Sequence, residues 1–242
     1  MTFIIEFAIL PRLIMVDYSN EIKDAIANGK KITLVTYHLS EKMEKQIDSV
    51  VSLLLSHYNK AELQPTLYSL IKEMVVNGTK ANAKHIFLQE LNINSAVEKD
   101  YDEGMHQMKE RLSEKFIIEY GQKAKTAGLD VKITFFHNDD GIRVEVTNNL
   151  TIIPADEKRL RLKLKEGMGY DDLVSFYMAN ADNTEGEGIG LVMNLLLLKA
   201  ENIDPALFRV ATNDGFTTAR VEIPLSENFV SVRGKNPAGF PS

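Results

Sequence analysis

Two β-hairpins constrain the fold of this 242-residue chain more than any other feature of its sequence. The first is "DVKITFFHNDDGIRVEVTN" (130–148), in which polar and apolar residues alternate on both sides of an Asp-Gly turn. The second, "LFRVATNDGFTTARVEIPL" (207–225), is built in the same way around "NDG". Such alternation indicates half-buried strands, and Asp-Gly is a preferred turn between antiparallel strands. The sequence therefore predicts an antiparallel sheet.

Helical spacing of apolar residues indicates the layer that covers this sheet. Ser40 is a suitable cap for a helix in which apolar residues then recur every three or four positions. Pro65 suits the first turn of a second helix, because proline is favoured there. The expected elements are, in chain order, a strand at 31–39, a helix after Ser40, a helix from about Pro65 to about Lys80, a strand at 84–93 and one long amphipathic helix at 103–127.

Together these elements predict an α+β fold, a two-layer sandwich of a mostly antiparallel sheet with helices on one face, rather than a βαβ array. The expected division is an N-terminal extension (1–30), a domain (31–228) and a flexible tail (229–242). Residues 94–128 are expected to be a helical insertion. Its apolar stripe must be covered by the domain itself or by a second copy of the chain, so a homodimer stays open.

Composition excludes several classes of function. The chain is 44% hydrophobic and 26% charged, as in ordinary globular proteins, and its net charge of −6 argues against a broad nucleic-acid surface. It has no cysteine, which rules out disulfides and thiolate metal sites and fits a reducing cytoplasm. The apolar start "TFIIEFAILPRLIMV" is interrupted by charges and is shorter than the roughly 20 residues of a membrane span. We expect a cytoplasmic protein with no membrane or nucleic-acid partner.

The stretch "TEGEGIGL" (184–191) is the first candidate for ligand binding, because it precedes a nearly unbroken apolar run. Its spacing fits neither the G-x-G-x-x-G loop that follows a strand in Rossmann folds nor a P-loop. The free amides at a helix start still form an anion site. The alternative is a flexible loop whose last glycine permits close packing of a buried helix.

A polar stripe on the second expected helix supplies a second candidate. Glu73, Asn77 and Lys80 are spaced i, i+4 and i+7, which places a carboxylate, an amide and an ammonium group on one side of the helix. Such groups can act as a water-activating base, a metal ligand and a phosphate contact. The alternative is a solvated stripe with a weak ion pair.

The order of these motifs resembles the GHKL superfamily, the Bergerat-fold ATPases that include DNA gyrase B, histidine kinases, anti-sigma kinases and heat-shock chaperones. "KEMVVNGTKAN" (72–82) matches the N box of the family, and "GEGIGL" (186–191) matches its second glycine box. "LVSFYMANADN" (173–183) is similar to the F-box region of histidine kinases. "GFTTARVEIPL" (215–225) resembles the final strand, where a threonine lies near the adenine.

One motif departs from the family pattern. The first glycine box begins with an aspartate that accepts a hydrogen bond from the adenine amino group, and the matching segment here is "VEVTNNLTII" (144–153). Asn148 takes the place of the aspartate, and Leu150 takes the place of the first glycine. An asparagine oxygen can accept the same bond without its charge-assisted part, so we expect weaker binding of the base.

The resemblance implies a stand-alone, Mg²⁺-dependent ATP-binding domain in signalling or regulation, with residues 151–185 as a lid over the triphosphate. The lid segment "EKRLRLKLK" (157–165) is interpreted as a solvated basic helix face, with a phosphate sensor or an acidic-partner surface as alternatives. A protein partner is expected at the lid or at the insertion. A non-hydrolysing scaffold is the second hypothesis, and a topoisomerase- or repair-type ATPase is a weaker third. The residues implied are Glu73 as the catalytic group, Asn77 as the Mg²⁺ ligand, and Asn77, Lys80, Asn148, Gly186, Gly188, Ile189, Gly190, Leu191 and Thr217 around ATP.

Overall fold

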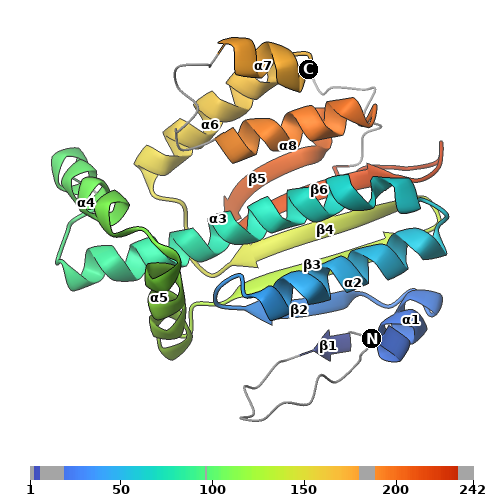
Figure 1. Ribbon diagram of the computed structural model, residues 1–242, viewed down its shortest axis with the longest axis horizontal. Helices are drawn as coiled ribbons and strands as arrows, with labels where there is room; N and C mark the ends of the chain where they lie inside the picture. Colours follow the sequence, from blue (N-terminus) through green and yellow to red (C-terminus); the bar gives the residue numbers. More distant parts are fainter. Residues whose placement is uncertain (1–2, 6–18, 96, 180–188, 234–242) are drawn as a thin grey trace.

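A mixed sheet forms one layer of the fold (Figure 1). The computed structural model describes residues 3–5, 19–95, 97–179 and 189–233. Within these residues the sheet has six strands in the order β1-β2-β3-β4-β6-β5. Neighbouring strands are antiparallel, except that β1 pairs in parallel with β2. The strands are β1 (Phe3–Ile5), β2 (Ile32–Thr36), β3 (Val131–Asn138), β4 (Gly141–Asn148), β5 (Phe208–Asn213) and β6 (Phe216–Pro224).

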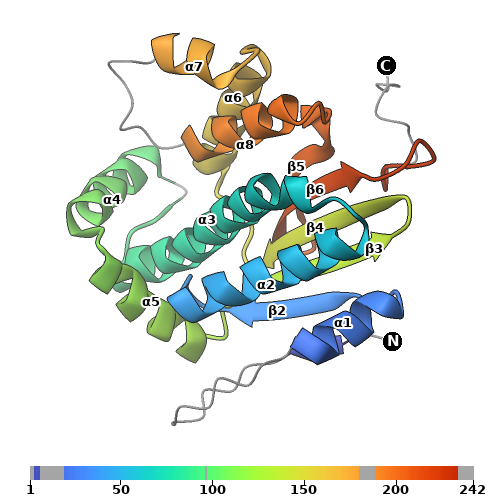
Figure 2. The same cartoon turned by 45° about the vertical axis from the view of Figure 1, so that its right-hand side comes forward.

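Helices form the second layer, and the two views show α2, α3 and α8 running across the same face of the sheet (Figures 1 and 2). α4 and α5 lie at one end of α3, and α6 packs against α8. The helices are α1 (Ser19–Ala27), α2 (Glu41–His57), α3 (Gln64–Glu90), α4 (Glu98–Arg111), α5 (Glu114–Thr126), α6 (Pro154–Met168), α7 (Leu173–Ala179) and α8 (Ile189–Ala200), with short 3₁₀ turns η1 (Ala61–Leu63) and η2 (Pro205–Leu207).

The core lies between these two layers. In β3, Val131, Ile133 and Phe135 are fully buried, whereas Lys132 between them is exposed. This alternation turns every second residue of a strand toward the helices. The prediction of an α+β fold with two layers and a mostly antiparallel sheet is therefore confirmed, as are both hairpins and the Ser40-capped helix, in which the Ser40 hydroxyl accepts from the Met43 amide.

The strand predicted at 84–93 is wrong, because α3 continues through this segment to Glu90. The segment contains neither glycine nor proline, so nothing in it stops the helix. Ile86 and Phe87 are buried in a second cluster with Phe116 and Tyr120 of α5. The rings of Phe116 and Tyr120 stack at 4.2 Å, and Phe87 meets both edge-on. This contact between helices outweighs the local strand propensity of the sequence.

The single helix predicted at 103–127 is also wrong, because the chain forms α4 and α5 with a break at Leu112 and Ser113. Ser113 is extended, and its hydroxyl accepts from the Phe116 amide, so it caps a new helix. Serine competes with helical backbone bonding in this way. The apolar stripe of the insertion packs on α3, so the domain itself covers it.

The described part of the segment expected to form the lid, residues 151–179, is largely helical and packs on α8. Gly167 of α6 lies against Leu195 of α8, where an added Cβ would be only 2.9 Å from the leucine side chain. Phe176 of α7 is buried against Val192 and Leu196. The helical interpretation of 157–165 is confirmed, despite its strand-like alternation of polar and apolar residues.

Residues at the two ends of the described chain add to the sheet. β1 extends the sheet as an edge strand, and α1 buries Ile22 and Ile26 in the main core. Residues after β6 pack on the face of the sheet that points away from α2, α3 and α8. There Phe229 covers Gly141. The Ser231 hydroxyl and the Val232 amide donate to the buried Glu222 carboxylate at 3.1 and 3.0 Å. Among the residues described, no helix combines the length and the apolar character needed to span a bilayer.

Candidate functional site

The structure brings Glu73 of α3 against the start of α8. Asn77 Nδ2 donates to Glu73 Oε1 at 2.9 Å, as the i, i+4 spacing on one helix allows. An ideal Cβ placed on Gly190 would overlap Oε1 and Cδ of Glu73 and lie 2.8 Å from Oε2. The Glu73 carboxylate therefore lies directly beside the first turn of α8, where the positive end of the helix dipole favours a negative charge.

This contact explains why position 190 carries glycine. Any larger side chain there would displace the Glu73 carboxylate from the helix start. Gly190 is helical, so a left-handed backbone is not the reason for the glycine. The requirement is close approach of the carboxylate to the backbone. Two residues predicted from separate motifs are thus neighbours in space.

Asn148 and Thr217 form a second pair at the end of the sheet. They are directly opposite in the β4–β6 register, so their side chains lie on the same face, which is the face covered by helices. Asn148 is only 5% exposed. The Thr217 hydroxyl donates to the Leu150 carbonyl at 2.6 Å, which fixes Leu150 beside this pair.

Gly78, which follows Asn77 in α3, faces the sheet. An ideal Cβ on Gly78 would lie 3.4 Å from both methyl groups of Val131 and 4.0 Å from Cβ of Asn148. The turn of α3 that follows Asn77 therefore lies against Val131 and Asn148 of the sheet.

The other predicted residues have different surroundings. Lys80 is exposed on α3, one turn beyond Asn77. Ile189 packs with the α7 cluster and Leu191 with the main core, so both side chains hold α8 in place. Gly186 and Gly188 lie outside the described residues, as does most of the glycine-rich stretch.

Three of the five basic side chains predicted on the lid are paired with carboxylates. Arg159 Nη2 lies 3.0 Å from Asp102, and Lys163 Nζ lies 2.8 Å from Glu166. Arg161 pairs with Glu157 at 3.1 Å. This pairing favours a solvated helix face over a phosphate sensor.

A polar group that the sequence reasoning missed lies beneath Asn148. Asn82 of α3 is fully buried, and its oxygen accepts a hydrogen bond from Asn148 Nδ2 at 3.2 Å. The available signal was its place on the buried face of α3, in line with Thr79 and Ile86. A polar side chain on such a face must have hydrogen-bond partners, so its presence predicts a specific contact.

A second missed group connects three helices. Lys84 of α3 contacts the Asp156 carboxylate of α6 and lies 3.2 Å from the hydroxyl of Tyr101 in α4. Tyr101 donates to Asp156 Oδ1 at 2.5 Å and has no exposed surface. This group fixes the start of α6 to the insertion.

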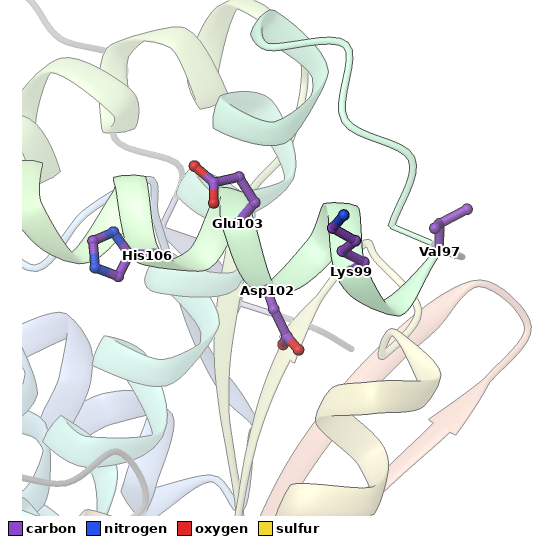
Figure 3. A pocket seen from close by; sticks show the side chains of 5 residues that line it. All are labelled: Val97, Lys99, Asp102, Glu103 and His106. Atoms are coloured by element: carbon purple, nitrogen blue, oxygen red, sulfur yellow. The ribbon is translucent and has the colours of Figure 1, made fainter.

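A surface hollow over α4 carries no comparable chemistry (Figure 3). Its side chains are spread along a single helix and its start, and Figure 3 shows them pointing in different directions. Over the described ranges, no three His, Cys, Asp or Glu side chains are placed to hold a metal ion together. The residues around the hollow are Val97, Lys99, Asp102, Glu103 and His106.

Comparison with known proteins gives one relative. No protein-family model matches the chain, and no solved structure matches it. A protein of Treponema pallidum (strain Nichols), described only as an uncharacterized protein, is 30% identical over 211 residues, or 87% of this chain. The chain spans 41% of the length of that relative.

Proposed function

We propose that this chain is a Mg²⁺-dependent ATP-binding domain of the GHKL type, with a Bergerat fold. The observation that carries the proposal is that α3 contacts two other predicted segments. Glu73, bonded to Asn77, lies against Gly190, and Asn82 is bonded to Asn148, which lies opposite Thr217. These residues come from four motifs of the resemblance: the N box, the two glycine boxes and the final strand.

The donor set fits a magnesium-bound nucleotide. Asn77 is exposed and uses its Nδ2 toward Glu73, which leaves its Oδ1 as a hard oxygen ligand. Mg²⁺ at nucleotide sites takes one or two protein oxygens together with phosphates and waters, so no cluster of protein ligands is needed. Bound Mg²⁺ would neutralise charge on the phosphate oxygens.

The side chains of the chain itself have distinct roles in this proposal. Lys80 and the amides at the start of α8 attract the phosphates. The Glu73 carboxylate orients an attacking water or hydroxyl group and accepts its proton, and its bond to Asn77 holds it toward the metal ligand. Asn148 accepts a hydrogen bond from the base, and the Thr217–Leu150 bond shapes the wall beside it.

The melting temperature of the chain, measured with and without ATP and Mg²⁺, tests the proposal. We expect Mg²⁺-ATP to raise it, because a ligand that binds the folded state stabilises that state. Asn77→Ala should abolish the rise. Gln107→Ala is the matched control, because Gln107 also donates to a glutamate four residues earlier on an exposed helix face, Glu103; it should leave the rise intact. Equal responses of the two variants would contradict the role of Asn77.

Hydrolysis is tested separately by phosphate release. Glu73→Gln keeps the size of the side chain and removes its basicity, so we expect ATP to bind while release falls by about 10²-fold or more. Unchanged release in Glu73→Gln would show that Glu73 is not the base. Binding without measurable release in the wild-type chain would favour the second candidate below.

The second candidate is a GHKL-type scaffold that acts through protein interaction without hydrolysis. It is favoured by exposed apolar side chains on α7, where Val174 is 66% and Met178 is 78% exposed. Such apolar side chains are available to contact a protein partner. Asn148, which stands where the resemblance leads one to expect an aspartate, also favours this candidate, because an amide binds the base more weakly.

A further inference from the structure

The hydrogen-bond partners of Asn82 determine which way its side-chain amide points. Its Nδ2 donates to the carbonyl oxygens of Leu129 and Asp130, both at 3.2 Å. A carboxamide has two N–H donors, so both are used. Carbonyl oxygens only accept, and a flipped Asn82 would set its own oxygen against them. The orientation of the Asn82 amide therefore follows from the chemistry of its partners.

This orientation dictates that of Asn148. The atom that Asn82 presents to β4 is its oxygen, which accepts from Asn148 Nδ2 at 3.2 Å. The reversed Asn148 would place two acceptor oxygens against each other in a buried site, which is disfavoured about tenfold or more. The Asn148 oxygen therefore points away from Asn82 and can accept a hydrogen bond from a ligand at the end of β4.

We infer that Asn82 is a positioning residue that fixes the Asn148 oxygen as the ligand-facing atom and thereby selects a base with an exocyclic amino group. This inference rests on the proposed function. A base with a carbonyl at the same position, such as hypoxanthine, would face the Asn148 oxygen with a second acceptor and be rejected.

The same geometry explains why position 148 carries asparagine. Asn82 offers an acceptor to this position, which suits a donating amide and repels a carboxylate. Asn148→Asp would restore the residue that the resemblance leads one to expect, yet here it places a negative charge against the Asn82 oxygen. We expect this substitution to lower both the melting temperature and the affinity for ATP.

The test is titration of the chain with Mg²⁺-ATP and with Mg²⁺-ITP, which differ at the position that Asn148 reads. In the wild type we expect ITP to bind roughly 10- to 100-fold more weakly, as for one lost and one repulsive hydrogen-bond pair. Asn82→Ala releases the Asn148 amide to rotate, so the ITP-to-ATP ratio of dissociation constants should fall to within about threefold of one.

Asn149→Ala is the matched control. Asn149 supports the same turn, because its Oδ1 accepts from the Asp130 amide at 3.0 Å and its Nδ2 donates to the Gly128 carbonyl at 2.7 Å. A purely structural role for Asn82 predicts that both variants change affinity alike without changing the ratio. A positioning role predicts that only Asn82→Ala changes the ratio.

The possible outcomes distinguish a failure of the proposed ATP binding from a failure of the proposed role of Asn82. If the wild type binds neither nucleotide, the proposed function fails, and the role of Asn82 fails with it. If it binds ATP and ITP equally, or keeps its preference in Asn82→Ala, the role of Asn82 is overturned while ATP binding stands. If Asn82→Ala does not fold, Asn148→Asp decides: tighter ATP binding than in the wild type overturns the inference, and weaker binding supports it.

Discussion

An alanine at position 190 should push the Glu73 carboxylate away from the start of α8, because the new Cβ would overlap Oε1 and Cδ of that side chain. Glu73 is partly exposed, so its carboxylate can move without unfolding the chain. It would then lose its hydrogen bond to Asn77 and its place at the helix N-terminus. The substitution therefore changes the free energy of unfolding through these local interactions alone.

Three terms contribute to this cost. The exposed hydrogen bond contributes about 0.5–1 kcal/mol, and the carboxylate at the helix start about 0.3–1 kcal/mol. A displaced rotamer adds about 0.5–1 kcal/mol. Alanine in place of glycine in a helix returns about 0.5–1 kcal/mol. We expect Gly190→Ala to destabilise the wild type by roughly 1–2 kcal/mol on these grounds.

A double-mutant cycle with Glu73→Ala isolates the contact. In the Glu73→Ala background the overlap is absent, so Gly190→Ala should stabilise the chain by about 0.5–1 kcal/mol. The free energies of unfolding come from urea titrations followed by circular dichroism. The coupling energy should be about 1–3 kcal/mol, whereas independent sites add to within roughly 0.5 kcal/mol. Additive effects would refute the contact between Gly190 and Glu73.

Four other contacts lead to predictions that can be measured. Gly78→Ala should stabilise the chain by about 0.5–1 kcal/mol in urea titrations, because an added methyl meets only ordinary contacts at 3.4 Å or more. Asp156→Asn should destabilise it by about 1–3 kcal/mol in the same assay, because it weakens the ion pair with Lys84. Burial lowers the pKa of His137, so the unfolded chain binds its proton more readily, and stability should fall as the pH drops below about 6.5. Tyr58→Phe removes the hydroxyl that bonds to Nδ1 of the neutral ring, so the pKa of His137 in NMR titrations should move up toward its ordinary value.

A control variant or a contradicting result exists for each of these predictions. Glu157→Gln removes an exposed partner of Arg161 in the same helix as Asp156, and it should change stability by less than about 0.5 kcal/mol. An equal loss in both variants would show that burial of the Asp156 pair is unimportant. A destabilised Gly78→Ala would indicate that α3 packs more tightly on the sheet than its contacts show. A His137 pKa at or above its ordinary value would contradict the effect of burial.

The parts of the fold that were predicted correctly are those set by local sequence. The two hairpins depend on alternation and turn residues that lie next to each other in the chain, and the α2 cap depends on Ser40 alone. The helical course of 84–90 depends instead on Ile86 and Phe87 meeting α5, a contact that no local pattern contains. Capping by Ser113 was a local signal that the long helical period concealed.

In the candidate site, too, the contacts within one element could be predicted from the sequence, and the contacts between distant segments could not. Glu73 and Asn77 are one helical turn apart, so their pairing follows from spacing, and it is observed. The contact of Glu73 with Gly190 and the bond between Asn82 and Asn148 join residues that are far apart in the chain. The motif order suggested which segments would meet, but only the folded arrangement shows which atoms do.

Calorimetric titration of the chain with ATP, in the presence of Mg²⁺ and in the presence of EDTA, measures whether the chain is a Mg²⁺-dependent ATP-binding domain. We expect binding that requires Mg²⁺ and that disappears in Asn77→Ala, since the Asn77 oxygen is the proposed metal ligand. No heat of binding at nucleotide concentrations up to about 1 mM, where even an interaction of roughly 4 kcal/mol is detected, would contradict it. ATP binding that is unaffected by both EDTA and Asn77→Ala would contradict it equally.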